Sequence, residues 1–152
     1  MNDNINKTVN EILESYSKHE QTCRLSEDNI INKSVLIKVL EEIRKLLFPG
    51  YFDKNRVREE YIGYIVGDRI EFIQYNLKKQ IAKALKGCEK CNDLSYDEVM
   101  EKSEKLVYEF LSKIPSIRDY LATDVVAAFN GDPAAYSTDE IILCYPGFFA
   151  IT

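Results

Sequence analysis

The longest periodic segment of the sequence runs from Asp53 to Gly87 and reads DKNRVREEYIGYIVGDRIEFIQYNLKKQIAKALKG. Its apolar residues recur at intervals of three or four, the spacing that places side chains on one face of an α-helix. These residues are Val57, Tyr61, Tyr64, Ile65, Phe72, Ile73, Leu77, Ile81 and Leu85. Acidic residues near the start and lysines near the end carry the charges that a helix dipole favours. The segment therefore predicts a long helix that begins after Asp53, its N-cap, and ends at Gly87.

Two glycines, Gly63 and Gly67, lie one helical turn apart on the same face of this predicted helix. A glycine inside a helix costs about 1 kcal/mol relative to alanine, so a pair of them needs a structural reason. We expect either that another helix approaches closely along this face or that the helix breaks there.

Helical spacing also extends through the sequence before Asp53. A first helix is predicted to start at a capping box formed by Thr8 and Glu11. Its apolar face consists of Val9, Ile12, Leu13 and Tyr16. A second helix is predicted from about Asn32 to Phe48, where Pro49-Gly50 ends it.

Three more helices are predicted after Gly87, each bounded by capping or helix-ending residues. A capping box of Ser95 and Glu98 opens one that continues to residue 114, and Pro115 opens the next, which ends at Asn130-Gly131. Another capping box, Ser137 with Glu140, opens a short helix that ends at 145–147. No stretch alternates with the period of a β-strand. The sequence therefore predicts an all-α fold.

Composition narrows the class of protein. The chain has 152 residues, of which 45% are hydrophobic and 30% charged, values typical of one globular domain. Its net charge of −5 argues against nucleic-acid binding, because phosphate contacts require concentrated basic charge. The apolar runs are too short to span a membrane, and the first residues lack the apolar core of a signal peptide. We expect a soluble cytoplasmic protein that binds neither nucleic acid nor membrane.

The cysteines and the single histidine do not form a recognisable metal or redox motif. Cys88 and Cys91 make a CxxC pair, which is compatible with ordinary loop thiols and also with metal or redox use. A structural zinc ion needs four ligands, and the remaining candidates, His19, Cys23 and Cys144, lie far away in the sequence. We expect no metal site, and we expect His19 to be a solvent-exposed residue.

The last residues, from Gly147 to Thr152, read like the opening of a further apolar helix. Chain termini are usually polar, so we expect the native chain to continue beyond Thr152. On this interpretation residues 1–152 form a single helical domain of a longer protein that has been cut at position 152.

Residues 124–150 read DVVAAFNGDPAAYSTDEIILCYPGFFA. This segment resembles the N-terminal helical domain of the serine O-acetyltransferases: a helix, a DPA turn, a short helix and a YPG turn that leads into another helix. GDRIEFIQYN, residues 67–76, is similar to the bacterial branch of this family that has a long N-terminal domain. The resemblance covers most of residues 57–152.

The resemblance implies an enzyme that transfers acetyl from acetyl-CoA to the hydroxyl of L-serine, producing O-acetylserine for cysteine biosynthesis. In this family a left-handed β-helix domain follows the helical domain and supplies the catalytic histidine and the CoA groove. No hexapeptide repeat of such a domain is present here, and His19 does not match that histidine. The resemblance therefore implies no catalytic or cofactor-binding residue in this chain, which is expected to be inactive on its own.

The resemblance also implies partners. Enzymes of the family join their catalytic trimers through the helical domain, so we expect a homo-oligomer. Docking on O-acetylserine sulfhydrylase would use a C-terminal tail that is absent from this chain.

The resemblance assigns one site, Asp132 with Pro133, to the serine pocket. A carboxylate suits this role because it can pair with the ammonium group of the substrate. Pro133 excludes the helical conformation at Asp132, so the carboxylate is expected to project from a turn. The same two residues also fit a helix N-cap followed by a proline at the first helical position.

An alternative function remains open from the residues alone. A free-standing helical module that only binds a partner would have the same periodicity and composition. The reading frame beyond Thr152 distinguishes the two, because hexapeptide repeats within about fifty residues would identify the acetyltransferase.

Overall fold

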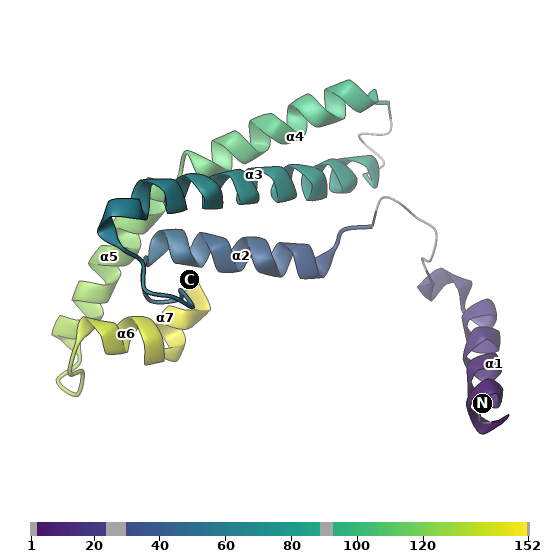
Figure 1. The fold of residues 1–152 in the computed structure, drawn as a ribbon, viewed down its shortest axis with the longest axis horizontal. Coiled ribbons are helices and arrows are strands. Elements are labelled where there is room, and N and C mark those ends of the chain that lie inside the picture. Colours follow the sequence, from purple (N-terminus) through teal and green to yellow (C-terminus); the bar gives the residue numbers. More distant parts are fainter. Residues whose placement is uncertain (1–2, 24–29, 89–92, 152) are drawn as a thin grey trace. The chain divides into compact units, whose positions relative to one another are not determined.

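The computed structural model describes residues 3–23, 30–88 and 93–151. Seven α-helices and two short 3-10 helices occur in these ranges, without a strand (Figure 1). In order they are α1 (Asp3–Lys18), η1 (Glu20–Thr22), α2 (Lys33–Leu47), η2 (Glu59–Tyr61), α3 (Ile62–Lys86), α4 (Tyr96–Leu111), α5 (Ile114–Gly131), α6 (Thr138–Cys144) and α7 (Pro146–Ile151). The prediction of an all-α fold is confirmed. None of the helices in these ranges combines the length and apolar composition needed to cross a membrane.

The chain divides into two compact units, Met1–Ile30 and Ile31–Thr152. The first unit contains α1 and η1, and the second contains the other helices. The expectation that residues 1–152 form a single domain stays a prediction.

Helix α1 begins at Asp3, so the predicted capping box at Thr8 and Glu11 is wrong. Thr8 lies inside the helix, and its hydroxyl donates to the carbonyl of Asn4 at 3.0 Å. The helix starts earlier because Ile5 extends the apolar stripe one turn upstream of Val9. The stripe is exposed within this unit, and its residues are Ile5, Val9, Ile12, Leu13 and Tyr16.

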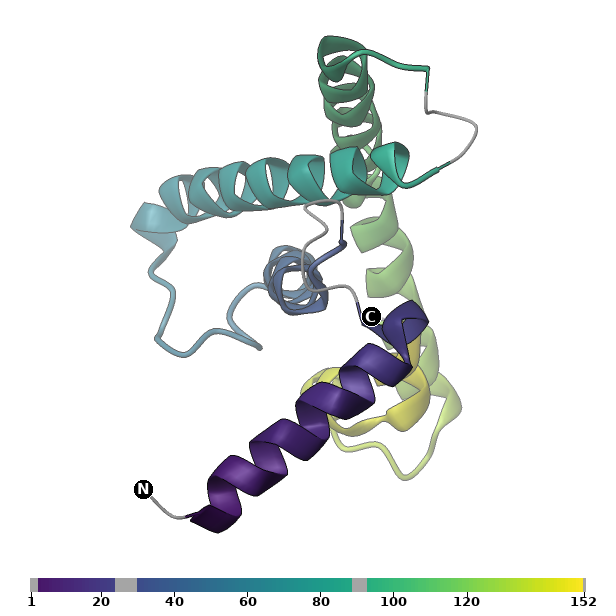
Figure 2. The ribbon, with the colours of Figure 1, turned by 90° about the vertical axis from the view of Figure 1, so that its right-hand side faces the viewer.

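In the second unit, α3 packs against α2 on one side and α4 on the other (Figures 1 and 2). Ile73 of α3 is fully buried in the core. The same core joins α2 to the C-terminal helices through Val39, Ile43, Leu47, Phe48, Ile114, Leu121, Val125, Ile141, Ile142 and Phe148. The rings of Phe48 and Phe148 meet edge to face, with centroids 5.5 Å apart. This contact fixes the start of α7 against the end of α2.

Several predicted caps are present. Asn32 caps α2 by accepting from the backbone N–H of Val35 at 3.2 Å. Ser95 and Glu98 form the predicted capping box of α4. That helix ends at Leu111, three residues before the predicted end, and α5 begins at Ile114 with Pro115 in its first turn. The N-caps at Asn32 and Ser95 agree with the sequence because each accepts from an N–H only three residues away.

Asp53 does not cap α3, which corrects another prediction. The helix begins only at Ile62, after η2. The carboxylate of Asp53 instead accepts from the N–H of Gly50 at 3.0 Å and forms an ion pair with the guanidinium of Arg69. Both side chains of this pair are buried, with 9% of each exposed. The ion pair holds the segment before α3 against that helix, and α3 itself begins only after η2.

Arg69 extends this contact into a charge cluster whose other two members, Glu42 and Lys45, are half-buried. Its guanidinium lies 3.4 Å from the carboxylate of Glu42 and donates to the carbonyl of Lys45 at 3.3 Å. The ammonium group of Lys45 lies 2.5 Å from the Glu42 carboxylate. The cluster therefore connects α2, α3 and the segment between them.

Helix α3 continues without a break through Gly63 and Gly67. A Cβ atom added at either position would have no neighbour within 4 Å. Neither the expected break nor a close helix contact occurs at these glycines within the described chain. This face of α3 is open.

Candidate functional site

The candidate site is the turn that joins α5 to α6. Asp132 is the C-cap of α5 and has an extended backbone, with φ −110° and ψ 106°, as Pro133 predicts. Its N–H donates to the carbonyl of Ala128 at 3.1 Å, and its carbonyl accepts from the N–H of Ala135 at 3.1 Å. The end of a helix and a tight turn therefore fix the backbone of Asp132.

Both oxygens of the Asp132 carboxylate accept hydrogen bonds from neutral donors. The backbone N–H of Ala134 donates to Oδ1 at 2.9 Å. The phenol of Tyr145, 13 residues later, donates to Oδ2 at 2.5 Å. A carboxylate has about four lone-pair positions, so about two remain for another ligand. Asp132 is half-buried and Pro133 is exposed, so this part of the turn is accessible from solvent.

These hydrogen bonds set the protonation states. The bond from Tyr145, and then that from Ala134, lowers the pKa of the Asp132 carboxyl from its ordinary value. The same carboxylate raises the pKa of Tyr145 to about 12, mainly through the hydrogen bond. At neutral pH Asp132 is therefore an anion and Tyr145 a neutral donor. Among the described ion pairs, none involves the Asp132 carboxylate. The group can therefore bind an external cation.

The alternative interpretation of Asp132 as a helix N-cap is wrong. The helix that follows, α6, begins at Thr138 and is capped by Ser137, whose hydroxyl accepts from the N–H of Glu140 at 3.2 Å. The carboxylate of Glu140 accepts a hydrogen bond from the backbone N–H of Tyr136. In a capping box it would accept from the N–H of Ser137, so only half of the predicted capping box is present. Asp132 instead stabilises the turn that follows it, because its side chain accepts from the N–H of Ala134 and its carbonyl from that of Ala135. Its assignment to a substrate pocket stays a prediction.

The sequence interpretation missed Tyr145. The run Tyr145-Pro146-Gly147 suggests only a helix-ending turn, and α6 does end at Cys144 with Tyr145 as its C-cap. No local pattern connects a tyrosine to an aspartate on the far side of a short helix. The contact between Tyr145 and Asp132 is visible only in the tertiary structure.

The other candidate residues do not gather into a site. His19 is exposed. Cys23, Cys88 and Cys144 are free thiols, whereas Cys91 lies outside the described residues. Within the described ranges, no group of three or more His, Cys, Asp or Glu side chains is arranged to hold a metal ion.

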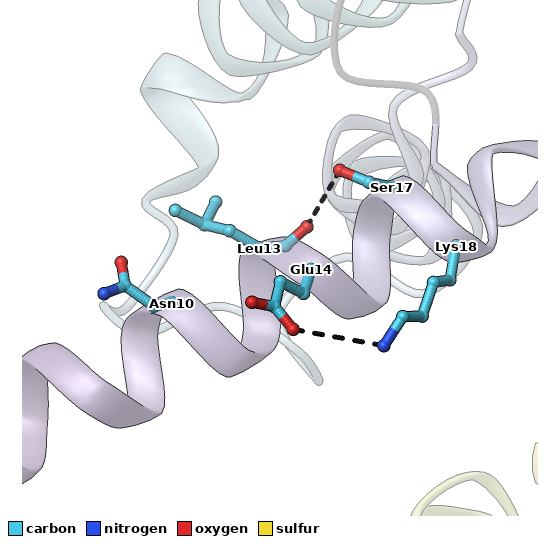
Figure 3. A pocket seen from close by; sticks show the side chains of 5 residues that line it. All are labelled: Asn10, Leu13, Glu14, Ser17 and Lys18. Atoms are coloured by element: carbon cyan, nitrogen blue, oxygen red, sulfur yellow. Dashed lines mark hydrogen bonds and ion pairs between the residues drawn. The ribbon is translucent and has the colours of Figure 1, made fainter.

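Two hollows among the described residues lie away from the turn. One lies on α1 and is lined by residues of that helix alone: Asn10, Leu13, Glu14, Ser17 and Lys18 (Figure 3). Ser17 donates to its own helix at the carbonyl of Leu13, and Glu14 lies 3.9 Å from Lys18 (Figure 3). These polar groups are partnered within the helix. The second hollow, about 290 Å³, lies between the end of α2, α5 and α6 and is lined mostly by apolar side chains. Neither hollow includes Asp132.

Comparison with known proteins identifies a family and a relative that this chain resembles. Residues 72–152 match the protein family described as "Serine acetyltransferase, N-terminal". A curated protein of Synechococcus elongatus, described as "Serine acetyltransferase, plasmid", is 32% identical over 117 residues. The alignment covers 75% of this chain and 37% of that relative. The chain therefore spans little more than a third of the length of the relative, and the matched region includes the whole of the turn at Asp132.

Proposed function

The chain belongs to the family of serine acetyltransferase N-terminal domains, and from this membership we propose that it is part of an enzyme that acetylates L-serine. The enzyme would transfer the acetyl group of acetyl-CoA to the serine hydroxyl and produce O-acetylserine for cysteine biosynthesis in the cytoplasm. In this proposal acetyl-CoA is a co-substrate of the whole enzyme and is not held by residues 1–152.

Within that enzyme, Asp132 would bind the ammonium group of serine, and Pro133 would hold the backbone that presents it. The observation that supports this role is the state of the Asp132 carboxylate. Two neutral donors hold it, it is ionised at neutral pH, and none of the described ion pairs involves it. A serine ammonium group supplies the missing cation and up to three donors for the free lone pairs.

The chemical step would be carried out elsewhere in the enzyme. We propose that a left-handed β-helix domain follows this chain and provides the histidine base and the CoA groove. Residues 1–152 would then form one wall of the serine pocket and support assembly. Docking of O-acetylserine sulfhydrylase would involve a tail beyond this chain.

A turnover assay tests this division of roles. The full-length enzyme is expected to release CoA thiol when acetyl-CoA and serine are both present, and the 152-residue chain alone is expected to release none. Thiol release is followed with a chromogenic disulfide, with acetyl-CoA alone as the blank. Robust turnover by the isolated chain would contradict the proposal, and so would a full-length protein that is inactive on serine.

We also propose that the chain associates with itself through its helices. The open face of α3 at Gly63 and Gly67 has room for a second helix to approach, because a Cβ atom there would have no neighbour within 4 Å in the described residues beyond its own helical turn. Light scattering of the 17.6 kDa chain is expected to show a dimer or larger species. Gly63→Ala with Gly67→Ala is expected to weaken association while favouring the helix of each chain by about 1 kcal/mol per site.

Two results would contradict this surface. A single 17.6 kDa species at high concentration would exclude self-association. An oligomer unchanged by the double alanine variant would place the contact elsewhere, for example at the exposed apolar stripe of α1.

A further inference from the structure

Tyr145 connects two parts of the candidate turn that are remote in sequence. It is the C-cap of α6 and has an extended backbone, with φ −79° and ψ 114°, immediately before α7 begins at Pro146. Its ring is partly buried against the hydrophobic core. The core thus anchors the ring, and the hydroxyl reaches back to Asp132 at 2.5 Å.

The two donors to Asp132 act on different oxygens. The Ala134 N–H belongs to the turn itself and would hold Oδ1 in any protein with this backbone. The Tyr145 phenol comes from outside the turn and fixes Oδ2. With one oxygen held, the carboxylate can still rotate about its Cβ–Cγ bond; with both held, its free lone pairs point in one direction. Tyr145 therefore sets the orientation of the carboxylate.

We propose that Tyr145 is a positioning residue that orients the Asp132 carboxylate toward the substrate ammonium group, an inference that depends on the proposed serine site. Tyr145 does not contact the substrate in this arrangement. It acts by restricting the carboxylate before the substrate arrives, which reduces the loss of freedom on binding.

The protonation states agree with this role. The hydrogen bond to Asp132 raises the pKa of Tyr145 to about 12, and burial and the nearby charge of Glu140 contribute to this increase. The phenol therefore remains a hydrogen-bond donor throughout the neutral range. The phenol in turn lowers the pKa of Asp132, so the carboxyl remains ionised there as well. The pair does not change state between the pH values at which the enzyme would be assayed.

The test is Tyr145→Phe in the full-length enzyme, which removes the hydroxyl and keeps the ring in the core. The KM for serine is expected to rise about three- to tenfold, the change expected for the loss of one hydrogen bond. The KM for acetyl-CoA is expected to stay at the wild-type value. Tyr136→Phe is the matched control, because Tyr136 lies in the connection between α5 and α6 that contains Asp132 and is 92% exposed. It is expected to behave as wild type.

A double variant distinguishes positioning from simple stabilisation. Once Asp132→Asn has removed the charge, adding Tyr145→Phe is expected to produce little further loss of serine use, because the two residues act as one unit. Independent effects that multiply would overturn the positioning role. A rise in KM for both substrates together with a lower melting temperature would also overturn it, because that pattern indicates a structural defect.

The failures of this inference and of the serine site are separable. If Asp132→Asn impairs serine use but Tyr145→Phe matches the Tyr136→Phe control, the positioning role is wrong and the serine site stands. If Asp132→Asn leaves serine kinetics unchanged, the serine site itself is wrong, and the role of Tyr145 falls with it.

Discussion

Asp132→Asn in the full-length enzyme is expected to lower kcat/KM for serine by about tenfold to a hundredfold or more, the loss typical of a charged hydrogen bond. Asparagine keeps an oxygen that can accept from the N–H of Ala134, so the turn is preserved while the negative charge is lost. The KM for acetyl-CoA is expected to remain near wild type, because that substrate would be bound by another domain. Steady-state kinetics with each substrate varied in turn measures both.

Two companion variants make this result specific. Asp124→Asn removes an exposed carboxylate from the neighbouring helix α5 and is expected to leave serine kinetics unchanged. Asp132→Ala removes both the charge and the turn hydrogen bond, so it is expected to lower the melting temperature as well as serine use. Unchanged serine kinetics in Asp132→Asn, with a lower melting temperature in Asp132→Ala alone, would assign Asp132 a structural role only.

Arg69→Ala is expected to destabilise the chain by about 3–5 kcal/mol, the usual cost of breaking a buried ion pair by removing one partner. The variant leaves the buried carboxylate of Asp53 without its cationic partner. It also removes one of the two cationic partners of Glu42, whose other partner is Lys45. It also releases the segment before α3 from that helix. Because domains are stable by only about 5–15 kcal/mol, the loss is a large fraction of the total. Urea unfolding followed by far-UV circular dichroism measures it.

Arg58→Ala is the matched control for Arg69. Arg58 lies in the same connection and pairs with Glu60 at 3.5 Å, but 71% of its side chain is exposed. Exposed pairs contribute about 0–1 kcal/mol, so the control is expected to unfold close to wild type. Equal, small effects at the two arginines would show that the charge cluster around Arg69 does not hold α2 and α3 together.

The helices and most of their ends were predictable from short-range chemistry. Asn32 and Ser95 cap the helices that follow them, as expected, because the donors that they satisfy lie only three residues away. The predicted caps at Thr8 and Asp53 are wrong, although both residue types suit a cap. Ile5 extends α1 upstream of Thr8, and buried Arg69 forms an ion pair with Asp53. A capping pattern states what a side chain can do locally, whereas burial decides which partner it takes.

The same distinction applies to the candidate site. The extended backbone of Asp132 follows from Pro133 alone, because the proline ring excludes the helical conformation of the residue before it. The second partner of its carboxylate does not follow from any local rule. Tyr145 reaches Asp132 only because α6 folds back and the core holds the tyrosine ring at a position from which its hydroxyl meets Oδ2. Backbone conformation is a property of adjacent residues, but the direction in which a carboxylate points depends on packing between segments that are distant in sequence.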